Sequence, residues 1–460
     1  MNIWKCKTPE QIFEACEGTE LRKNLRAIDL AALGIGSVVG TGIFVATGQG
    51  AHLAGPGVLL SFIIAAVTCG LCALTYSELA CMFPIAGSTY SYSYVAFGEV
   101  IAWIIGWDLM LEYLVAASAV ASGWSTTFIG LIESAGVKLP KALTTTLIAG
   151  GVIDLPAVLI TLLITWILFI GIRESARINN IIVLVKIAVI LLFIFLGLRH
   201  ISLANLKPMM PFGWKGVMAG AAIIFFAYIG FDAVSTAAEE TKNPKRDVPL
   251  GLMLCLGVVI ILYVAVAFVL TGIVPFKEID VGNALPAALS RIGIRWGGAL
   301  VATGAIIGMV STLLVTLYGQ IRIFMVMARD GLIPPVFAKV HPEHKTPHIC
   351  TWITGVATAA IAGLFPLPMI IDLCNIGTLF AFVLVSVGVV VLRHKKPDLE
   401  RKFRTPGVPF TPLITVVFCF YLMYSLPTVT WIRFGAWLLG GLIIYFAYSV
   451  RHSRLQHSRS

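Results

Sequence analysis

The stretches GSVVGTGIF (residues 36–44) and FFAYIGFD (residues 225–232) each place glycine in the middle of a long apolar segment. Glycine is unfavourable inside a helix and permits unwound backbone. At the depth of a lipid bilayer, unwound backbone is tolerated only where it is buried in protein or lines a watery cavity. The two interruptions fall in the first and the sixth apolar segments. This pairing predicts a binding site at mid-membrane between two structural repeats, as in secondary transporters.

The composition is that of an integral membrane protein. Of the 460 residues, 58% are hydrophobic and 12% are charged, whereas about 25% of residues are charged in soluble domains. About twelve apolar segments have the ~20 residues that a membrane helix requires, which leaves little chain for a soluble domain. They cover approximately residues 27–49, 57–83, 98–132, 155–172, 178–198, 215–238, 249–274, 294–327, 349–365, 368–392, 408–427 and 430–450.

The apolar segments divide into two halves that together form a predicted transport core, residues 27–392. Repeat one covers 27–198 and repeat two covers 215–392. Each half opens with a glycine-interrupted span and contains five spans, so the second half enters the membrane from the opposite side. We therefore expect an all-α membrane fold with a five-plus-five inverted repeat and broken helices 1 and 6. Two accessory helices, 408–450, would form a scaffold that contacts lipid, a second copy or a small membrane protein.

The formal net charge of +10 could suggest binding to nucleic acid, but its distribution indicates membrane topology instead. With the N-terminus in the cytoplasm, 23 of the 33 Lys and Arg residues lie on the cytoplasmic side and 9 outside. This positive-inside bias places the amphipathic arm 1–26 and the basic tail 451–460 in the cytoplasm. The basic run 393–396 is interpreted as a topological anchor, and contact with lipid headgroups is the alternative. No cleavable signal peptide is evident.

Several motifs resemble the amino acid–polyamine–organocation superfamily. They are the glycine break in the first span, PIAGSTYSY (84–92) and EETKNPKRDVP (239–249). FAYIGFD (226–232) and YGQIR (318–322) narrow the resemblance to the cationic amino acid transporter family. Animal members have more spans than this chain, which therefore looks like a bacterial member. The resemblance covers nearly the whole chain and implies the inverted-repeat fold and transport of an L-amino acid across the plasma membrane.

A zwitterionic amino acid needs partners for its carboxylate and its ammonium group. Free N–H groups at the start of a half-helix bind an anion, helped by the helix dipole. Close packing through small residues is the alternative explanation for the glycines. In span 1 the predicted donors to the substrate carboxylate are the backbone around Gly40, Thr41 and Gly42, with the Thr41 hydroxyl nearby, and Val38 is a further predicted substrate-binding residue.

The second interruption is expected to hold the ammonium group. The resemblance assigns this role to backbone carbonyls near Phe226, Ala227 and Ile229. Phe226 lies just before the break, so it is also a candidate gate over the bound side chain. Ordinary packing of an aromatic residue in an apolar span is the alternative.

Lys186 lies in the middle of IIVLVKIAVI (181–190). A lysine at the bilayer centre costs ~2.5–3.5 kcal/mol on insertion scales, so it is a functional candidate by default. The resemblance implies that this lysine takes the place of a sodium ion and contacts span 1 near its break. The hypothesis is that Lys186 gains a proton outside and loses it inside, which couples transport to the proton gradient. A structural ammonium that permanently caps span 1 carbonyls is the alternative.

Two acids in span 3, Asp108 and Glu112, are four residues apart and share one helix face, which must point inward because lipid-facing acids are costly. The resemblance places Glu112 near the substrate side chain, where a carboxylate favours Lys, Arg or ornithine. An internal network with Tyr113 is the alternative, and Asp108 is expected to serve structure near the membrane edge. Thr316 in span 8 would leave room for a longer substrate if it faces the pocket.

Other classes of membrane protein fit less well. The eight histidines lie in loops or at span ends, and HPEH (341–344) lacks the HExxH spacing, so neither a metal nor a cofactor is expected. No repeated filter of a channel is visible, and no convergent set of catalytic groups indicates an enzyme. The sequence thus predicts a secondary transporter that imports cationic or small neutral amino acids such as alanine by proton symport and alternating access. Amino acid exchange is the alternative mode.

Overall fold

The structure, a computed structural model, describes residues 3–8, 25–83, 88–171, 176–238, 241–344 and 346–457. In these ranges the chain folds into helices and loops, and pairing between extended segments is limited to isolated β-bridges. The expected all-helical class is confirmed. The acidic positions of the predicted N-terminal arm, the PIAG part of the 84–92 motif and Glu239–Glu240 lie outside the described residues.

The first half of the chain forms helices whose order follows the predicted spans. They are α2 (Ala27–Val38), the π-helical turn η1 (Gly42–Ala46), α3 (Thr47–Ala54), α4 (Val58–Met82), α5 (Ser88–Ala96), α6 (Glu99–Ser134), α8 (Leu155–Ile170) and α9 (Ala176–Leu198). Shorter turns connect them: η2 (Gly55–Gly57), α7 (Lys141–Thr144) and η3 (Leu147–Ala149).

The second half of the chain also consists of long and short helices. It contains α10 (Gly213–Ile224), the 3-10 turn η4 (Phe225–Tyr228), α11 (Ala233–Thr236), α12 (Pro244–Ile273), α13 (Ala284–Arg291), α14 (Arg295–Arg329), α15 (His348–Leu364), α16 (Leu367–Lys395), α17 (Phe410–Tyr424) and α18 (Thr428–Ile444). The connecting and terminal pieces are η6 (Phe276–Glu278), η7 (Pro335–Ala338), η8 (Tyr445–Ser449), α19 (Val450–His452) and α20 (Arg454–His457).

Within the described chain, eight helical segments are long and apolar enough to cross a membrane, and four shorter apolar helices accompany them. Many apolar side chains on these helices point outward, and Ile261 and Leu184 are 70% and 67% exposed. Such exposure suits a lipid-facing surface, because lipid tails are as apolar as the side chains. The eight long segments are Gly42–Met82, Glu99–Ser134, Asn179–Leu198, Gly213–Ser235, Pro244–Ile273, Arg295–Arg329, Leu367–Lys395 and Thr428–His457.

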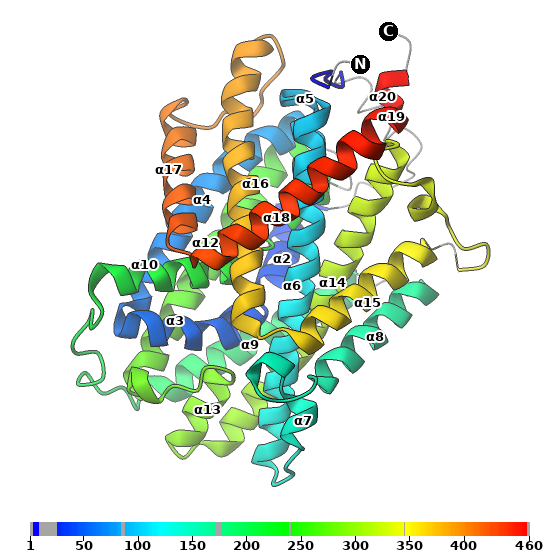
Figure 1. The fold of residues 1–460 in the computed structure, drawn as a ribbon. Coiled ribbons are helices and arrows are strands. Elements are labelled where there is room, and N and C mark those ends of the chain that lie inside the picture. Colours follow the sequence, from blue (N-terminus) through cyan, green and yellow to red (C-terminus); the bar gives the residue numbers. More distant parts are fainter. Residues whose placement is uncertain are drawn as a thin grey trace.

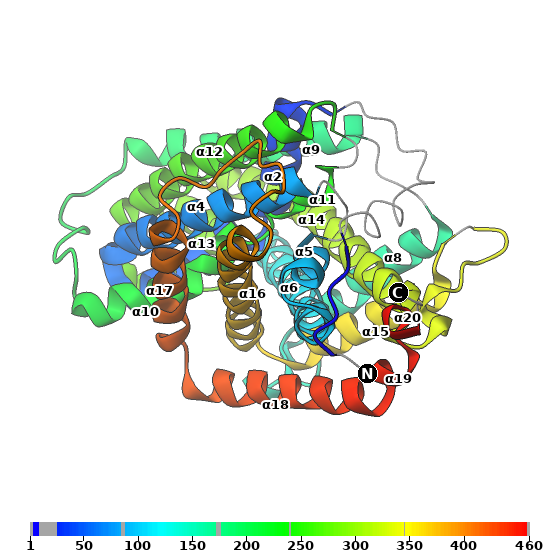
Figure 2. The ribbon, with the colours of Figure 1, turned by 90° about the horizontal axis from the view of Figure 1, so that it is seen from above.

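The helices pack as a bundle around the long pair α6 and α14 (Figure 1). Helix α16 packs on α6, and α12 packs on both α2 and α4. Seen from above, α18 runs along one edge of the molecule, and α9 and α12 lie on the opposite side (Figure 2). The interior between these edges contains both predicted breaks.

Both ends of the chain lie at the same end of the bundle (Figure 1). Lys7 near the N-terminus forms an ion pair with Asp330, just after α14, at 2.7 Å. The backbone N–H of Arg454 near the C-terminus donates to Asp330 O at 3.0 Å, and Lys5 Nζ donates to Leu455 O at 2.7 Å. The carboxyl end of α14 therefore marks the side of the molecule that carries the termini.

Candidate functional site

The first break separates α2 from the helical turns that follow. Helix α2 ends at Val38, and Val39 adopts φ −75° and ψ 96°, outside the helical region. The chain becomes helical again at Thr41 and continues through η1 into α3. The first N–H groups of a helix have no partner within that helix. The backbone at Gly40, Thr41 and Gly42 thus has the geometry predicted for an anion-binding helix start.

The second break follows the 3-10 turn η4. Ile229 is extended at ψ 138°, and Gly230 has φ +110°, a conformation that only glycine adopts without strain. A Cβ at Gly230 would lie 2.8 Å from Ser37 Oγ, so the second break packs directly on the last turn of α2. Helicity returns only at α11, which has four residues.

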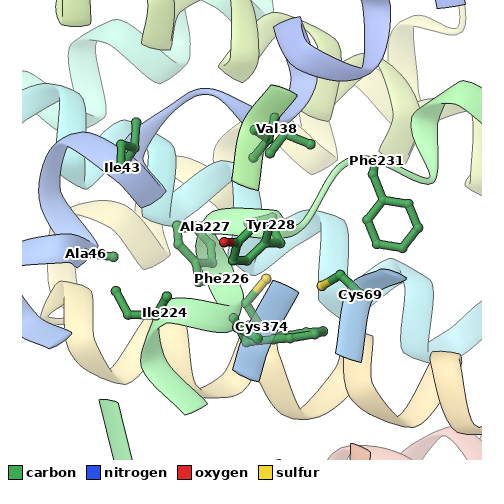
Figure 3. Close-up of a cluster of buried hydrophobic side chains, with 14 of the residues drawn as sticks. Val38, Ile43, Ala46, Cys69, Ile224, Phe226, Ala227, Tyr228, Phe231 and Cys374 are labelled. Carbon is green, nitrogen blue, oxygen red and sulfur yellow. The ribbon is translucent and has the colours of Figure 1, made fainter. Parts of the chain in front are cut away.

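The two breaks also meet through Gly42 and Ala227. A Cβ at Gly42 would lie 2.3 Å from Ala227 Cα, a distance that no side chain can occupy. Figure 3 shows Val38 and Ile43, on either side of the first break, in one buried cluster with Phe226, Ala227 and Tyr228 of the second. Glycine at position 42 is therefore needed for close approach of the two unwound segments.

A cavity of about 150 Å³ lies between the breaks. An apolar cavity of ~150 Å³ can hold a molecule as large as benzene, so the space suits a small metabolite. Ala227 is the one predicted binding residue outside the lining, because it packs on Gly42 behind the cavity wall. The predicted binding residues that line the cavity are Val38, Gly40, Thr41, Gly42, Glu112, Phe226, Ile229 and Thr316.

The cavity continues toward the end of the molecule that carries the chain termini. Tyr318, Arg322 and Val326, on the carboxyl half of α14, all line it. On the opposite side, the segment after α12 packs over α3. There, the His52 ring Nε2 lies 2.7 Å from Ile279 O. The cavity is thus covered on the side of α3 and extends toward the end of the molecule that carries the chain termini.

Lys186 lies beside the first break, where the resemblance places it. Its side chain on α9 is fully buried. The ammonium Nζ donates to Gly36 O in the last turn of α2 at 2.5 Å and to Thr312 Oγ1 on α14 at 2.9 Å. Thr312 also lines the cavity. The ammonium thus connects the end of α2 with a wall of the site, although it is not itself a lining residue.

Two carboxyl groups border the cavity, those of Glu112 and Asp232. Glu112 is 5% exposed, and its Oε2 receives no hydrogen bond from the described residues. Asp232, at the start of α11, is 7% exposed and close enough to interact electrostatically with Glu112. Tyr113 also borders the cavity. The predicted position of Glu112 at the cavity therefore agrees with the geometry, and Asp232 joins it as a second acid.

The side chains of Phe226 and Thr316 both reach the cavity. Phe226 is 6% exposed. The hydroxyl of Thr316 donates to Thr312 O of its own helix at 2.8 Å, so its polar atom is already satisfied. Thr316 therefore contributes mainly space and a methyl group to the wall.

Sequence reasoning missed several residues that line this site or cap a helix beside it. Thr312 precedes Thr316 by one helical turn and is the residue that bonds Lys186. Asn375 on α16 donates its Nδ2 to Ala222 O at 2.7 Å and to Ile223 O at 3.4 Å, at the end of α10. Its signal was visible as an amide inside the apolar span 368–392, since polar groups within the membrane tend to be functional. Arg322 was quoted only as part of a motif.

In the part of the chain that the structure describes, no three His, Cys, Asp or Glu side chains form a group that could hold a metal ion. The rings of His341 and His344, before α15, and of His348, at its start, contact one another instead. The ring centroids of His341 and His344 lie 4.9 Å apart, and those of His341 and His348 lie 5.3 Å apart. The chemical groups at the site are backbone groups, the ammonium of Lys186, the carboxyls of Glu112 and Asp232, the guanidinium of Arg322, and hydroxyl and apolar side chains.

The chain is similar in sequence to known membrane transporters. A family model described as amino acid permease matches residues 25–447. The chain is 48% identical over 457 residues to a methylthioribose transporter and 47% identical over 463 residues to the branched-chain amino acid permease BcaP, both from Bacillus subtilis, with 99% of each chain covered. It is 38% identical over 389 residues to a vacuolar cationic amino acid transporter 4 of Arabidopsis thaliana, covering 82% of this chain and 64% of that protein.

Proposed function

This chain belongs to the amino acid permease family of membrane transporters, and from that premise we propose that it imports L-amino acids together with protons across a bacterial plasma membrane. The observation that carries the proposal is the cavity between the two helix breaks. Its wall includes Gly40, Ile229 and Thr312, and Thr312 receives a hydrogen bond from the buried ammonium of Lys186. Substrate and proton sites are thereby adjacent.

We further propose twelve spans with repeats at 27–198 and 215–392, followed by accessory helices within 408–450. The two capping contacts support the repeat. Lys186, on the fifth span of repeat one, bonds the last turn of that repeat's first helix. Asn375, on the fifth span of repeat two, bonds the last turn of that repeat's first helix. Equivalent contacts in the two halves are expected of an inverted repeat.

The positive-inside bias supports an orientation with both termini in the cytoplasm. In that orientation the cavity opens to the cytoplasm, because it extends along the carboxyl half of α14, which adjoins both termini. The conformation is then inward-facing. The accessory helices α17 and α18 expose residues such as Tyr424 (81%) and Ile443 (69%), which suits contact with lipid, a second copy or a small membrane protein.

The transport cycle follows from the breaks. The N–H groups around Gly40 to Gly42 would bind the substrate carboxylate, and carbonyls near Phe226 and Ile229 would bind its ammonium group. Phe226 would close over the bound side chain as a gate. Rocking of the bundle formed by spans 1, 2, 6 and 7 against the other helices would expose the site to each side in turn. Release of the proton from Lys186 would remove its positive charge and one N–H donor, weaken its hold on Gly36 O and Thr312, and so favour reorientation.

The substrate class depends on the charge of the residues around the part of the cavity that would hold the side chain of the substrate. Glu112 and Asp232 favour a cationic side chain such as that of Arg, Lys or ornithine. Val120, Val315 and Ile323 line the same cavity and favour a small or branched apolar side chain. The relatives named as cationic and as branched-chain amino acid carriers span the same two classes. Discrimination therefore rests on Glu112, whose Oε2 receives no hydrogen bond from the described residues.

The proposal is tested with purified protein in liposomes. Uptake of labelled Arg, Lys, ornithine, Ala and Leu, and of methylthioribose, is measured with an inward proton gradient, with sodium alone, and with neither. We expect an amino acid to accumulate only with the proton gradient. Glu112→Gln should lower uptake of cationic substrates about 10–100-fold while sparing Ala or Leu, since hydrogen bonds to charged groups are worth ~1.5–3 kcal/mol. Sodium-dependent, pH-insensitive uptake would contradict the proton coupling.

Amino acid exchange is the second candidate mode, because the residues of the site do not set the direction of net transport. Liposomes preloaded with unlabelled substrate distinguish the two modes. An exchanger would take up label only into preloaded vesicles, whereas a symporter would also fill empty vesicles when the proton gradient is imposed.

A further inference from the structure

Asp108 is a buried acid that the proposed mechanism does not use. It is fully buried on α6. Neither of its carboxyl oxygens receives a hydrogen bond from the residues that the structure describes. It lies one helical turn from Glu112, which borders the cavity, but it is not itself a lining residue.

The carboxyl group of Asp108 is held in the interface between α6 and α16. A Cβ at Gly377 would lie 2.9 Å from Asp108 Oδ1 and 3.9 Å from Glu112 Cβ, so the same glycine faces both acids. The titratable groups that act on Asp108 are Glu112 on its own helix and the buried thiol of Cys374 on α16. On α14, the other long helix packed here, neutral Gln320 donates to Met110 O at 3.4 Å.

This environment is unfavourable for a carboxylate ion. Moving an ion into a buried site costs several kcal/mol unless a cation or hydrogen-bond donors compensate for the lost water. The neighbours of Asp108 are instead an acid and a thiol, neither of which stabilises negative charge. A neutral carboxylic acid avoids most of this cost, because its oxygens carry no net charge.

We propose that Asp108 is a second proton-binding site of the transporter, occupied in this conformation and separate from Lys186. The proton leaves when the α6–α16 interface opens to water: the Asp108 O–H bond breaks, the Glu112 carboxylate accepts the proton, and Glu112 passes it to the cavity. This cycle rests on the proposed alternating-access function, since reorientation is what would open the interface. The occupied state itself does not depend on transport.

The first test reads the protonation state directly by infrared difference spectroscopy of the full-length protein. We expect wild-type protein at neutral pH to show a C=O stretching band of a protonated carboxyl group that is missing in Asp108→Asn. The band should persist in Asp398→Asn, which changes an exposed acid in the loop after α16. If Asp108→Asn leaves the band unchanged, Asp108 is ionised and the proposal is wrong.

The second test asks whether this proton moves. The number of protons carried per substrate is obtained from the reversal potential in liposomes. We expect this ratio to fall by one in Asp108→Asn, while exchange between labelled and unlabelled substrate continues. If Asp108→Asn removes the infrared band but leaves the ratio of protons to substrate unchanged, Asp108 is a permanently neutral structural acid and the proposed cycle is wrong. Whether Lys186 itself couples proton and substrate transport is measured separately, with the variant Lys186→Met in the same assay.

A third variant covers the case in which Asp108→Asn does not fold. Glu112→Gln leaves Asp108 in place but removes the group that would accept its proton. We expect the infrared band to remain and the proton ratio to fall. Loss of the band in Glu112→Gln would assign the proton to Glu112 instead and contradict the proposal.

Discussion

Helices α2 and α10 both end inside the protein. A different side chain donates a hydrogen bond to the free backbone carbonyl oxygens at each end. At the end of α2, the ammonium of Lys186 donates to Gly36 O at 2.5 Å. At the end of α10, the amide of Asn375 donates to Ala222 O at 2.7 Å. Both capping residues are fully buried. The same structural requirement is met by a titratable cation in one place and by a neutral group in the other.

This difference assigns separate tasks to the two breaks. An ammonium can lose a proton and with it one hydrogen bond to the helix end, whereas an amide keeps its two donors at any physiological pH. The capping contact at the first break can therefore change with protonation, whereas the contact that Asn375 makes at the second break cannot. Substitutions at the two breaks can therefore test whether only the first one depends on protonation.

The largest effect is expected from Lys186→Met, which removes the cation but keeps an apolar stem of similar length. The variant loses a charge-assisted contact worth ~1.5–3 kcal/mol, and it loses the group that can titrate. We expect gradient-driven accumulation to vanish while exchange of labelled for unlabelled substrate persists. Uptake into liposomes with and without a proton gradient measures this, and Lys207→Met, at an exposed position, is the matched control. Undiminished accumulation in Lys186→Met would remove the contrast between the breaks.

The next effect comes from Gly42→Ala, at the point where the two breaks touch. The new methyl group would lie 2.3 Å from Ala227 Cα, so the segments must move apart. Overpacking of this kind costs ~1–3 kcal/mol, and here the strain falls on the binding site itself. We expect substrate affinity to drop at least about tenfold, as equilibrium binding to purified protein would show.

Gly70→Ala serves as the control for this substitution, since a Cβ at Gly70 meets nothing within 4 Å. It should leave both affinity and thermal stability essentially as in the wild type. Equal losses in both variants would mean that position 42 has no special role in the contact between the breaks.

The sequence predicted the breaks and the side chain that caps the first one, because glycines and a lysine in apolar spans are costly and therefore informative. Lys186 stands out against its neighbours, and the structure places it at the end of α2. Asn375 carried a weaker signal of the same kind in LCNIG (373–377), which was overlooked because an amide costs less to bury than a charge. Thr312 could not be placed, since helix phase depends on packing between distant spans.

Asn375→Leu should cost less than the loss of Lys186 and affect a different property. It leaves Ala222 O and Ile223 O without their side-chain donor, and an unsatisfied buried carbonyl costs ~1–3 kcal/mol. We expect a lower melting temperature in detergent and a lower maximal rate, but the dependence of uptake on pH should keep its wild-type shape. Thermal unfolding and a pH series of initial rates measure the two parts. A displaced pH profile would show that the second break also senses protons.

The smallest effect is expected from a pair of tyrosine hydroxyls in one aromatic cluster, whose rings lie 5.4 Å apart. Tyr263 donates to Val38 O at the end of α2, and Tyr228 donates to Phe62 O on α4, both at 3.1 Å. Tyr263→Phe and Tyr228→Phe each delete one hydroxyl and should each cost ~0.5–1.5 kcal/mol of stability. Only Tyr263 shares the end of α2 with Lys186, so only Tyr263→Phe should move the midpoint of the pH profile of uptake. If both variants move it equally, proton coupling is a property of the whole cluster, and the assignment of coupling to the first break alone is wrong.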